Sequence, residues 1–440
     1  MSVFRNDLLR RGLRKCFDCP ACHEKTSVRW GGYAKCLMRL GIIIYILLVP
    51  LGHAPREIGS ILAVTGVLFF YLLDFPSSNL SRFQLKWLFF IFFAFLAFKV
   101  MHSVDIARSW GVFCNAYKGL FLFFPALEFV RGKKDLKILI MLFAIMGFYE
   151  GLDGVYQFFT GHDLIRNTSL FDGSRLTGSM KTPRVGNLTS LVIPISCGLY
   201  FILENRWGIA KTIGTTFILI FPLVFLFVGS QTRSAYVGVF LAAIGTLMLI
   251  RGVSWKYIAG AVLCIFIVGT FGPNRVSFER AIHGERFEEV WPLAWQSFLK
   301  NPFFGGGIHS YKPVAQSTQL GKELEGEGEY IHPHPHNIYL QFAAETGMVG
   351  IALALTFFGT YLFWSAKRIR MGLKDPGYRE HFILATCFWA SYLGYLGTAF
   401  SAHNFFRAWW LGTAMIILGV LIASCLDRTS GGTEPAATQT

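Results

Sequence analysis

Three histidines, His332, His334 and His336, alternate with Pro333 and Pro335. Three nearby imidazoles could hold zinc, but the prolines impose an extended, twisted chain that scatters side chains around its axis. One imidazole with a near-neutral pKa can instead take a proton from a hydroxyl. We therefore predict that His336 is a general base, with an interfacial histidine of no catalytic role as the alternative.

Cationic side chains also gather in the hydrophilic stretches between the apolar blocks. The planar fork of arginine binds phosphate oxygens in pairs, so several such residues could neutralise a diphosphate. Arg233 stands in a very short turn, Gln231-Thr232-Arg233-Ser234, between two apolar blocks. For any single arginine, contact with a lipid headgroup or an acidic side chain is the alternative. The set comprises Arg166, Arg175, Lys181, Arg184, Arg233, Arg275, Arg280 and Arg286.

The composition indicates where these side chains are held. Of 440 residues, 53% are hydrophobic and 15% are charged, whereas soluble proteins carry about 25% charged residues. A soluble enzyme is excluded, and we predict an all-α, polytopic membrane protein with about 12 transmembrane helices. The expected spans are 37–53, 58–73, 85–101, 110–130, 136–158, 187–203, 212–229, 235–250, 255–272, 337–364, 381–400 and 405–424.

The basic residues predict an orientation. Lys and Arg number 41 against 26 Asp and Glu, a formal net charge of +15. Most short loops rich in Lys and Arg fall on one side under a twelve-span count, which makes that side and both termini cytoplasmic. This rule explains much of the excess charge, so no nucleic-acid partner follows. The first 35 or so residues do not resemble a signal peptide, so we expect an uncleaved first helix.

The predicted spans divide the chain into five parts. Residues 1–36 form a basic cytoplasmic tail, and 37–272 hold spans one to nine with an outer loop at 159–186. Residues 273–335 form a large outer loop, expected to be a small helical cap with an amphipathic helix at 285–300, a flexible turn at Gly305–Gly307 and a mobile acidic stretch at 323–329. Residues 336–426 hold the last three spans, and 427–440 form a cytoplasmic tail.

Two further clusters leave alternatives open. Cys16, Cys19, Cys22 and His23 have spacings found in zinc or iron–sulfur sites, or they lie in a basic tail with free thiols. Lys118 lies in the fourth predicted span, and Glu150 and Asp153 lie near the outer end of the fifth. Charged residues at these positions indicate either a functional role or structural ion pairs with one another or with Glu345.

The run from His336-Asn337 to Gly347 and Gly350 resembles the motif of bacterial O-antigen ligases, in which His and a polar residue precede two glycines three apart. The next position is usually Asn, Thr or Tyr but is Ile351 here. The Thr232-Arg233-Ser234 turn is similar to a second family feature. Arg286 with Pro302, Gly305 and Gly307 resembles a third, and Arg175 with Gly178 a fourth.

This resemblance implies a transferase at the periplasmic face of the bacterial inner membrane. Its donor would be a glycan on undecaprenyl pyrophosphate and its acceptor the lipid A-core. His336 would be the base and Arg233, Arg286, Arg175 and Arg184 would bind the pyrophosphate, with Asn337 and Arg166 in support. No cofactor or metal is expected, and the transfer would invert the anomeric centre. An O-antigen polymerase, a protein O-oligosaccharyltransferase and a lipid-linked glycan transporter are the alternatives.

Overall fold

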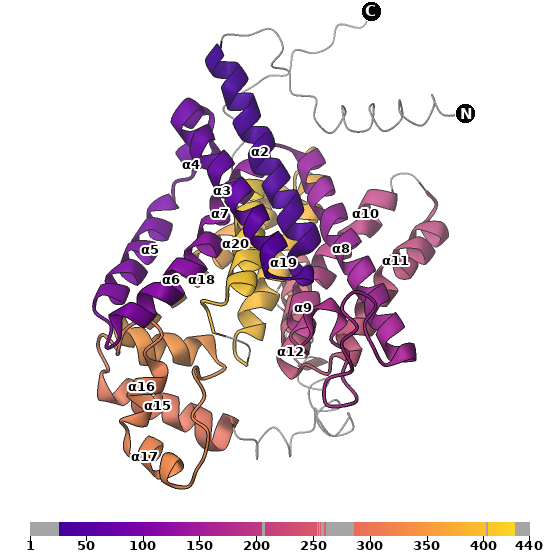
Figure 1. Ribbon diagram of the computed structural model, residues 1–440. Coiled ribbons are helices and arrows are strands. Elements are labelled where there is room, and N and C mark those ends of the chain that lie inside the picture. Colours follow the sequence, from indigo (N-terminus) through magenta and orange to yellow (C-terminus); the bar gives the residue numbers. More distant parts are fainter. Residues whose placement is uncertain are drawn as a thin grey trace, which may run out of the picture.

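The computed structural model describes residues 26–204, 207–252, 254, 256, 259–260, 286–401 and 404–426. Within these residues every extended element is a helix, and the only strand-like pairings are two isolated bridges between 162 and 175 (Figure 1). The helices are α2 (Thr26–Leu48), α3 (His53–Asp74), α4 (Asn79–Arg82), α5 (Lys86–Met101), α6 (Ile106–Phe121), α7 (Phe123–Phe129), α8 (Lys133–Thr160), α9 (Val185–Ser196), α10 (Gly198–Glu204), α11 (Ile209–Gly229), α12 (Arg233–Arg251), α15 (Trp291–Lys300), α16 (Tyr311–Gln316), α17 (Gln319–Gly326), α18 (Ile338–Gly372), α19 (Arg379–Thr398) and α20 (Ala408–Cys425).

Eight helical stretches in the described residues are long and apolar enough to cross a membrane. The prediction of an all-α polytopic protein is therefore confirmed, although about twelve spans were expected. Two of the other expected spans correspond to helices of only 16 residues, α5 and α6, the latter followed by the short α7. The span expected at 255–272 lies almost entirely outside the described residues.

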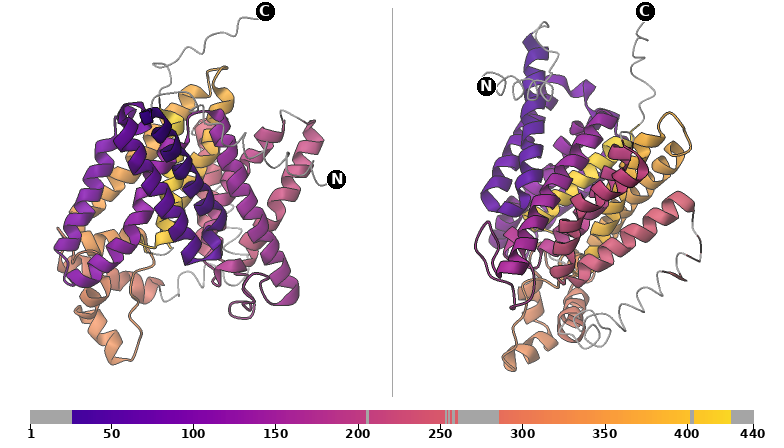
Figure 2. Two further views of the ribbon diagram at one scale, coloured as in Figure 1. Left: turned by 45° about the horizontal axis from the view of Figure 1, so that its top comes forward. Right: turned by 90° about the vertical axis from the view of Figure 1, so that its right-hand side faces the viewer.

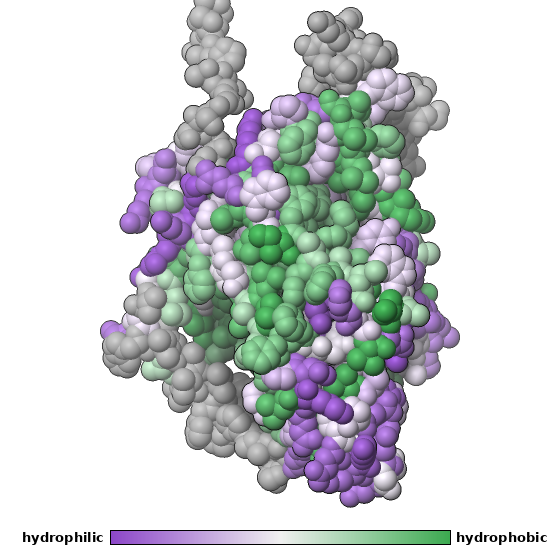
Figure 3. Space-filling model, turned by 90° about the vertical axis from the view of Figure 1, so that its left-hand side faces the viewer, coloured by the Kyte–Doolittle hydropathy of each residue, from purple (hydrophilic) through white to green (hydrophobic). Residues whose placement is uncertain are grey.

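Apolar side chains dominate both the interior and the flank of the bundle. The last helix, α20, is buried along nearly its whole length (Figure 2). On the flank, large apolar side chains such as Leu72 and Phe363 are 81% and 73% exposed. Figure 3 shows one such face, where an apolar region lies above a hydrophilic end formed by the cap. Because exposed apolar surface of this extent is unfavourable in water, this flank is the surface that meets lipid.

The two ends of the bundle differ in charge and in structure. At one end Lys133 and Lys137 of α8 both contact Glu380 of α19, with Nζ–Oε distances of 2.5 and 2.6 Å. Arg39 of α2 pairs there with Asp135 at 3.1 Å. At the other end α15, α16 and α17 form a helical cap (Figure 1). The basic loops that the charge rule assigns to one side therefore share an end of the structure.

The element α18 is broken at Gly347. This residue has φ 67° and ψ −166°, a conformation that only glycine adopts readily. The break frees backbone groups that the turn after Pro302 satisfies. Met348 N–H donates to the carbonyl of Pro302 at 2.7 Å, and Gly307 N–H donates to the carbonyl of Glu345 at 2.8 Å. The two glycine-containing motifs of the sequence are therefore the two halves of one backbone joint.

This joint corrects the prediction of a flexible turn at Gly305–Gly307. Gly305 and Gly307 adopt positive φ, and a Cβ at Gly305 would lie 2.4 Å from the carbonyl carbon of Glu345. The turn is thus packed against α18 and hydrogen-bonded to it. Its glycines are needed because two backbones approach too closely for a side chain.

The cap agrees in part with its prediction. The amphipathic helix expected at 285–300 is present as a π-helical turn (Arg286–Val290) followed by α15. Leu293 and Ala294 pack with Tyr311 of α16, while Trp295 remains 52% exposed. The acidic stretch was expected to be a mobile loop from its first residue, but α17 extends through the first half of it to Gly326.

Lys118, Glu150, Asp153 and Glu345 do not pair with one another, so the predicted ion pairs among them are wrong. Lys118 instead forms an ion pair with Glu57 of α3. The Glu150 carboxylate accepts from the Ser179 hydroxyl at 2.7 Å, and Asp153 accepts from Leu164 N–H at 2.7 Å. These two acids therefore fix the loop that follows α8. Glu345 accepts from Gln341 at 3.2 Å.

We expect Gly347→Ala to lower the stability of the protein. Its Cβ would lie 2.3 Å from the backbone carbonyl of Phe303, and the strained φ alone costs about 1–3 kcal/mol. Gly359→Ala in the same helix is the control, because it meets only the Phe363 ring at 3.9 Å and alanine favours a helix. The measurement is the thermal unfolding midpoint of each purified variant in detergent. Equal midpoints for the two variants would contradict the role of the joint.

Candidate functional site

His336 lies at the cap end, directly before α18. Its φ of 53° is in the left-handed region, which residues other than glycine adopt rarely. The next residue, Asn337, fixes this position, because its side-chain oxygen accepts from the N–H groups of Tyr339 and Leu340 at 2.9 and 3.1 Å. The following N–H, of Ile338, donates to the carbonyl of Ala399 at 3.0 Å. His336 is thus held at a helix start that is docked on the end of α19.

The three histidines of the His-Pro run form a compact group. The ring centroids of His334 and His336 are 4.2 Å apart, and those of His332 and His336 are 5.1 Å apart. His334 is buried, whereas His332 and His336 are half-buried. His336 is therefore the member of the group whose ring contacts both of the others, and it remains half-buried.

Burial and neighbouring cations keep these imidazoles neutral. Burial lowers the pKa of His336, and the charges of His334, Arg286, His332 and Arg184 lower it further. Burial also lowers the pKa of His334, to about 4, with smaller contributions from the same surroundings. At neutral pH His336 is therefore unprotonated and able to accept a proton.

Three of the predicted arginines stand at helix starts. Arg184 directly precedes α9, Arg233 is the first residue of α12, and Arg286 begins the turn that leads into α15. Helix N-termini carry unsatisfied N–H groups and the positive end of the helix dipole, which favour bound anions. The helix N-termini and the guanidinium groups at these positions therefore both favour a bound anion.

Arg184 is half-buried, and its guanidinium forms no hydrogen bond or ion pair with any residue that the structure describes. Burial lowers its pKa, but an arginine remains protonated at any physiological pH. A partly desolvated cation without a partner is unfavourable. Because its charge also acts on His336, Arg184 is the clearest candidate to contact an anionic ligand.

The guanidinium groups of Arg286 and Arg175 donate hydrogen bonds to other residues of the protein. Arg286 Nη1 donates to the Ser401 carbonyl at 3.1 Å and to the Ser401 hydroxyl, which joins the cap to the segment after α19. Arg175 Nε donates to the Ser230 carbonyl at 2.9 Å, and its Nη2 lies 3.4 Å from the Gln231 carbonyl. Arg175 thus clamps the turn from which Arg233 projects.

Close packing brings this turn to the start of α9. A Cβ at Gly186 would lie 2.2 Å from the Ser230 hydroxyl, and Thr232 donates to the Pro183 carbonyl at 2.7 Å. The start of α9, with Arg184, and the start of α12, with Arg233, are therefore adjacent.

Arg166 lies apart from this group. Its guanidinium donates to the Leu51 carbonyl in the turn between α2 and α3, where its charge acts on Arg56. It is not among the charges that shift the pKa of His336. Arg275, Arg280, Cys16, Cys19, Cys22 and His23 fall outside the described residues.

The structure adds His309, which the sequence analysis did not select. It has φ 57°, and its Nδ1 is buried without a partner in the described residues. Its charge is among those that lower the pKa of His334, and its own pKa is lowered by burial and by Arg108. An isolated histidine after a glycine-rich turn gives no spacing signal, so only the fold places it beside the His-Pro run. Over the described residues, no group of three His, Cys, Asp or Glu side chains is arranged to hold a metal ion.

Comparison with known proteins agrees with the resemblance seen in the motifs. A family model described as O-antigen ligase matches residues 216–355, which include Arg233, Arg286, His336 and Gly347. The chain is 24% identical over 215 residues to a protein of Rickettsia typhi named "Putative polysaccharide ligase", covering 46% of this chain and 50% of that one. A protein of Rickettsia prowazekii with the same description is 24% identical over 217 residues, again 46% and 50% of the two chains.

These matches confirm the recognition of an O-antigen ligase domain and a distant homology to polysaccharide ligases. The matched region spans about half the length of these relatives. Arg166, Arg175 and Arg184 lie outside the part that the family model covers.

We expect Asn337→Ala to destabilise the start of α18. Loss of a side-chain cap costs about 0.5–2 kcal/mol, and Asn337 is the only described side chain that accepts from these two N–H groups. Asn337→Ser is the matched control, since serine also caps helices. Thermal unfolding of both variants in detergent is the measurement, and an alanine variant as stable as the serine variant would contradict the capping role.

Proposed function

We propose that this protein is an O-antigen ligase that transfers a glycan from undecaprenyl pyrophosphate to the lipid A-core. The proposal places the cap and the site at the periplasmic face of the inner membrane, with both termini and the basic end in the cytoplasm. It retains about twelve spans, with α5, α6–α7 and α19 crossing as well. The observation that carries it is the arrangement of a neutral His336 beside the unpaired, half-buried Arg184.

The arginines suit a diphosphate leaving group. When the bond between the anomeric carbon and the diphosphate oxygen breaks, negative charge develops on that oxygen. Cations fixed in a partly desolvated site stabilise such charge strongly, because they need no reorganisation during the reaction. Arg184 and Arg233, from adjacent helix starts, would bind the phosphates directly. Arg286 would add charge from the cap, where it also contacts Ser401.

His336 supplies the other half of the reaction. Its imidazole would take the proton from the acceptor hydroxyl while that oxygen attacks the anomeric carbon. The new glycosidic bond forms as the bond to the diphosphate breaks on the opposite face, so the anomeric centre is inverted and no covalent glycosyl–enzyme forms. The proton ends on His336 and the electron pair on the departing diphosphate, so charge is balanced within the site.

The remaining predicted residues would hold the reacting side chains in position. Arg175 would hold the turn that carries Arg233, and Asn337 would hold the helix start that carries His336. Arg166, bound to the Leu51 carbonyl, would stabilise the neighbouring outer turn. We propose that no metal is required, because no Asp-x-Asp pair stands beside these cations in the sequence.

The rival functions use the same donor differently. An O-antigen polymerase would join the donor glycan to another lipid-linked repeat, so its acceptor distinguishes it. A lipid-linked glycan transporter would line a cavity at the bilayer midplane with its cationic residues. Here Arg184, Arg233 and Arg286 stand at helix starts at one end of the bundle, which favours chemistry at the surface.

The first test uses cells whose only gene copy encodes His336→Ala. We expect long glycan to accumulate on undecaprenyl pyrophosphate while the lipid A-core stays bare, because the acceptor hydroxyl cannot be deprotonated. Gel analysis of lipopolysaccharide and of the lipid-linked pool is the measurement. His162→Ala is the control, since this exposed histidine lies in the outer loop away from the His-Pro run.

Other outcomes decide against the proposal. A lipid A-core that carries single repeat units would identify a polymerase. Normal amounts of lipopolysaccharide and of lipid-linked glycan in the His336→Ala strain would show that His336 is not the base. Loss of ligation in the His162→Ala strain as well would show a general defect of the membrane protein.

The low pKa of His336 predicts a shift on donor binding. In the free enzyme burial and neighbouring cations lower this pKa, so activity that needs the neutral base persists below pH 6.5 and is lost only as pH falls through the lowered value. The bound diphosphate brings negative charge, which favours the protonated form and raises the pKa. We therefore expect the acid limb of kcat to lie at higher pH than that of kcat/KM.

Initial rates of the purified enzyme with a lipid-linked donor, measured between about pH 4 and 8, are the test. Because the pKa of free His336 is lowered to about 2, kcat should show an acid limb in this range and kcat/KM should not. Arg184→Gln removes one of the cations that lower the pKa of His336, so its kcat/KM limb should move to higher pH. Coincident limbs for kcat and kcat/KM in the unaltered enzyme would contradict this account.

A further inference from the structure

A large opening between the described helices lies far from His336, toward the basic end of the bundle. It is a cavity of about 1210 Å³ between α9–α10, α12 and the junction of α18 with α19. Pro194, Val239, Ala243 and Ile383 are among its apolar lining residues. The proposed transfer reaction uses none of these residues.

The cavity has a strongly one-sided charge. Five basic residues line it and no acidic residue does; the five are Arg251, Lys367, Arg370, Lys374 and Arg379. All five are exposed, and none pairs with a carboxylate among the residues that the structure describes. The nearby Glu380 is already bound by Lys133 and Lys137. The basic rim therefore lacks a counter-charge from the described part of the protein.

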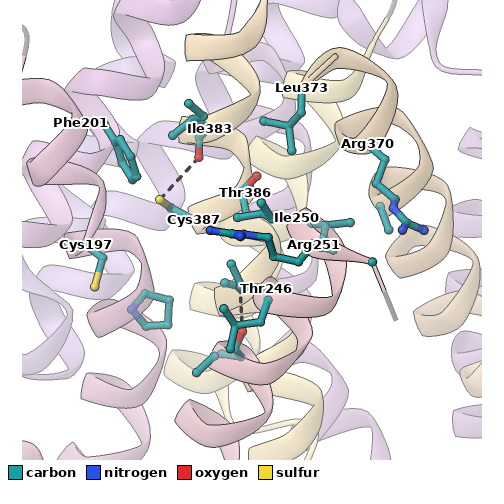
Figure 4. Close-up of a pocket in the computed structure, with 18 of the residues that line it drawn as sticks. Cys197, Phe201, Thr246, Ile250, Arg251, Arg370, Leu373, Ile383, Thr386 and Cys387 are labelled. Atoms are coloured by element: carbon teal, nitrogen blue, oxygen red, sulfur yellow. Dashed lines mark hydrogen bonds between the residues drawn. The ribbon is translucent and has the colours of Figure 1, made fainter. Parts of the chain in front are cut away.

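The geometry separates the charged rim from the apolar walls. Along α12 the lining runs from Val239 to Arg251, which at 1.5 Å per residue is roughly 18 Å. This depth is close to one leaflet of a hydrocarbon core about 30 Å thick. Figure 4 shows Arg251 extending from the end of α12 into the cavity beside Thr386 and Cys387, with Arg370 on the neighbouring helix. The cavity is thus basic at the membrane surface and apolar toward the midplane.

We propose that this cavity binds an anionic phospholipid of the leaflet at the basic end. The phosphodiester headgroup would lie among Arg251, Arg370 and their basic neighbours, and the acyl chains would lie along α12 and α19. Basic pockets between helices at this surface are suited to acidic headgroups, and a zwitterionic lipid would gain little from five unpaired cations. The bound lipid would connect α12 to the α18–α19 junction.

The general preference of cytoplasmic loops for Lys and Arg is the competing explanation for the charge. It does not require a cavity or any specific position for the cations. Arg82 and Lys134 lie at the same end of the bundle, are exposed and do not line the cavity. They provide a charge-matched control.

The test is native mass spectrometry of the full-length protein in detergent with added phosphatidylglycerol or phosphatidylethanolamine of the same acyl chains. We expect one phosphatidylglycerol to be retained per chain and phosphatidylethanolamine to bind much more weakly. Arg251→Gln with Arg370→Gln should weaken phosphatidylglycerol binding about tenfold or more, because two contacts to the phosphodiester are lost. Arg82→Gln with Lys134→Gln should leave it unchanged.

A second variant tests the apolar part of the cavity without altering charge. Ala243 is exposed to the cavity, so Ala243→Trp should fill it and also reduce binding. Equal binding of the two lipids, or an equal loss of binding in both double variants, would mean that the cations only orient the protein in the membrane. No retained lipid in the unaltered protein would mean that another part of the chain, such as the span expected at 255–272, fills the cavity. Either result would overturn the proposal.

Discussion

The backbone joint at Gly347 determines how the two halves of the site are held together. A helix break near the hydrocarbon exposes N–H and C=O groups that have no water to bind, so these groups must find partners in the protein. The turn after Pro302 provides them through the N–H of Gly306 and Gly307 and the carbonyls of Pro302 and Phe303. This requirement fixes the cap on α18, and with it the starts of α15 and α18.

The consequence is that the candidate residues His336, Arg184, Arg233 and Arg286 stand at helix starts or just before them. At about 1.5 Å per residue the 35-residue α18 would be roughly 50 Å long, more than the hydrocarbon core requires. The break allows its first part to stand at the rim, where Ile338 binds the end of α19 and His336 is left half-buried. Packing of Gly186 on the 230–232 turn brings the starts of α9 and α12 together in the same way.

The sequence predicted the fold class and the candidate residues, but not the connections that hold these residues in place. Histidine and arginine types, together with apolar block lengths, were enough to select His336, Arg184 and Arg233. They could not separate Arg184 from Arg175, because only the fold shows that Arg175 is engaged by the 230–232 turn. The glycines at 305–307 suggested flexibility, since sequence alone does not show a second backbone beside them. His309 was missed for the same reason.

The unpaired Arg184 and the neutral His336 depend on each other. A protonated His336 beside Arg184 and Arg286 would place like charges together, so the cations keep the base neutral until a ligand arrives. In the proposed reaction, a bound diphosphate would remove this repulsion and stabilise the imidazolium that forms. The cations proposed to bind the leaving group would therefore make His336 a stronger base only when the donor is present.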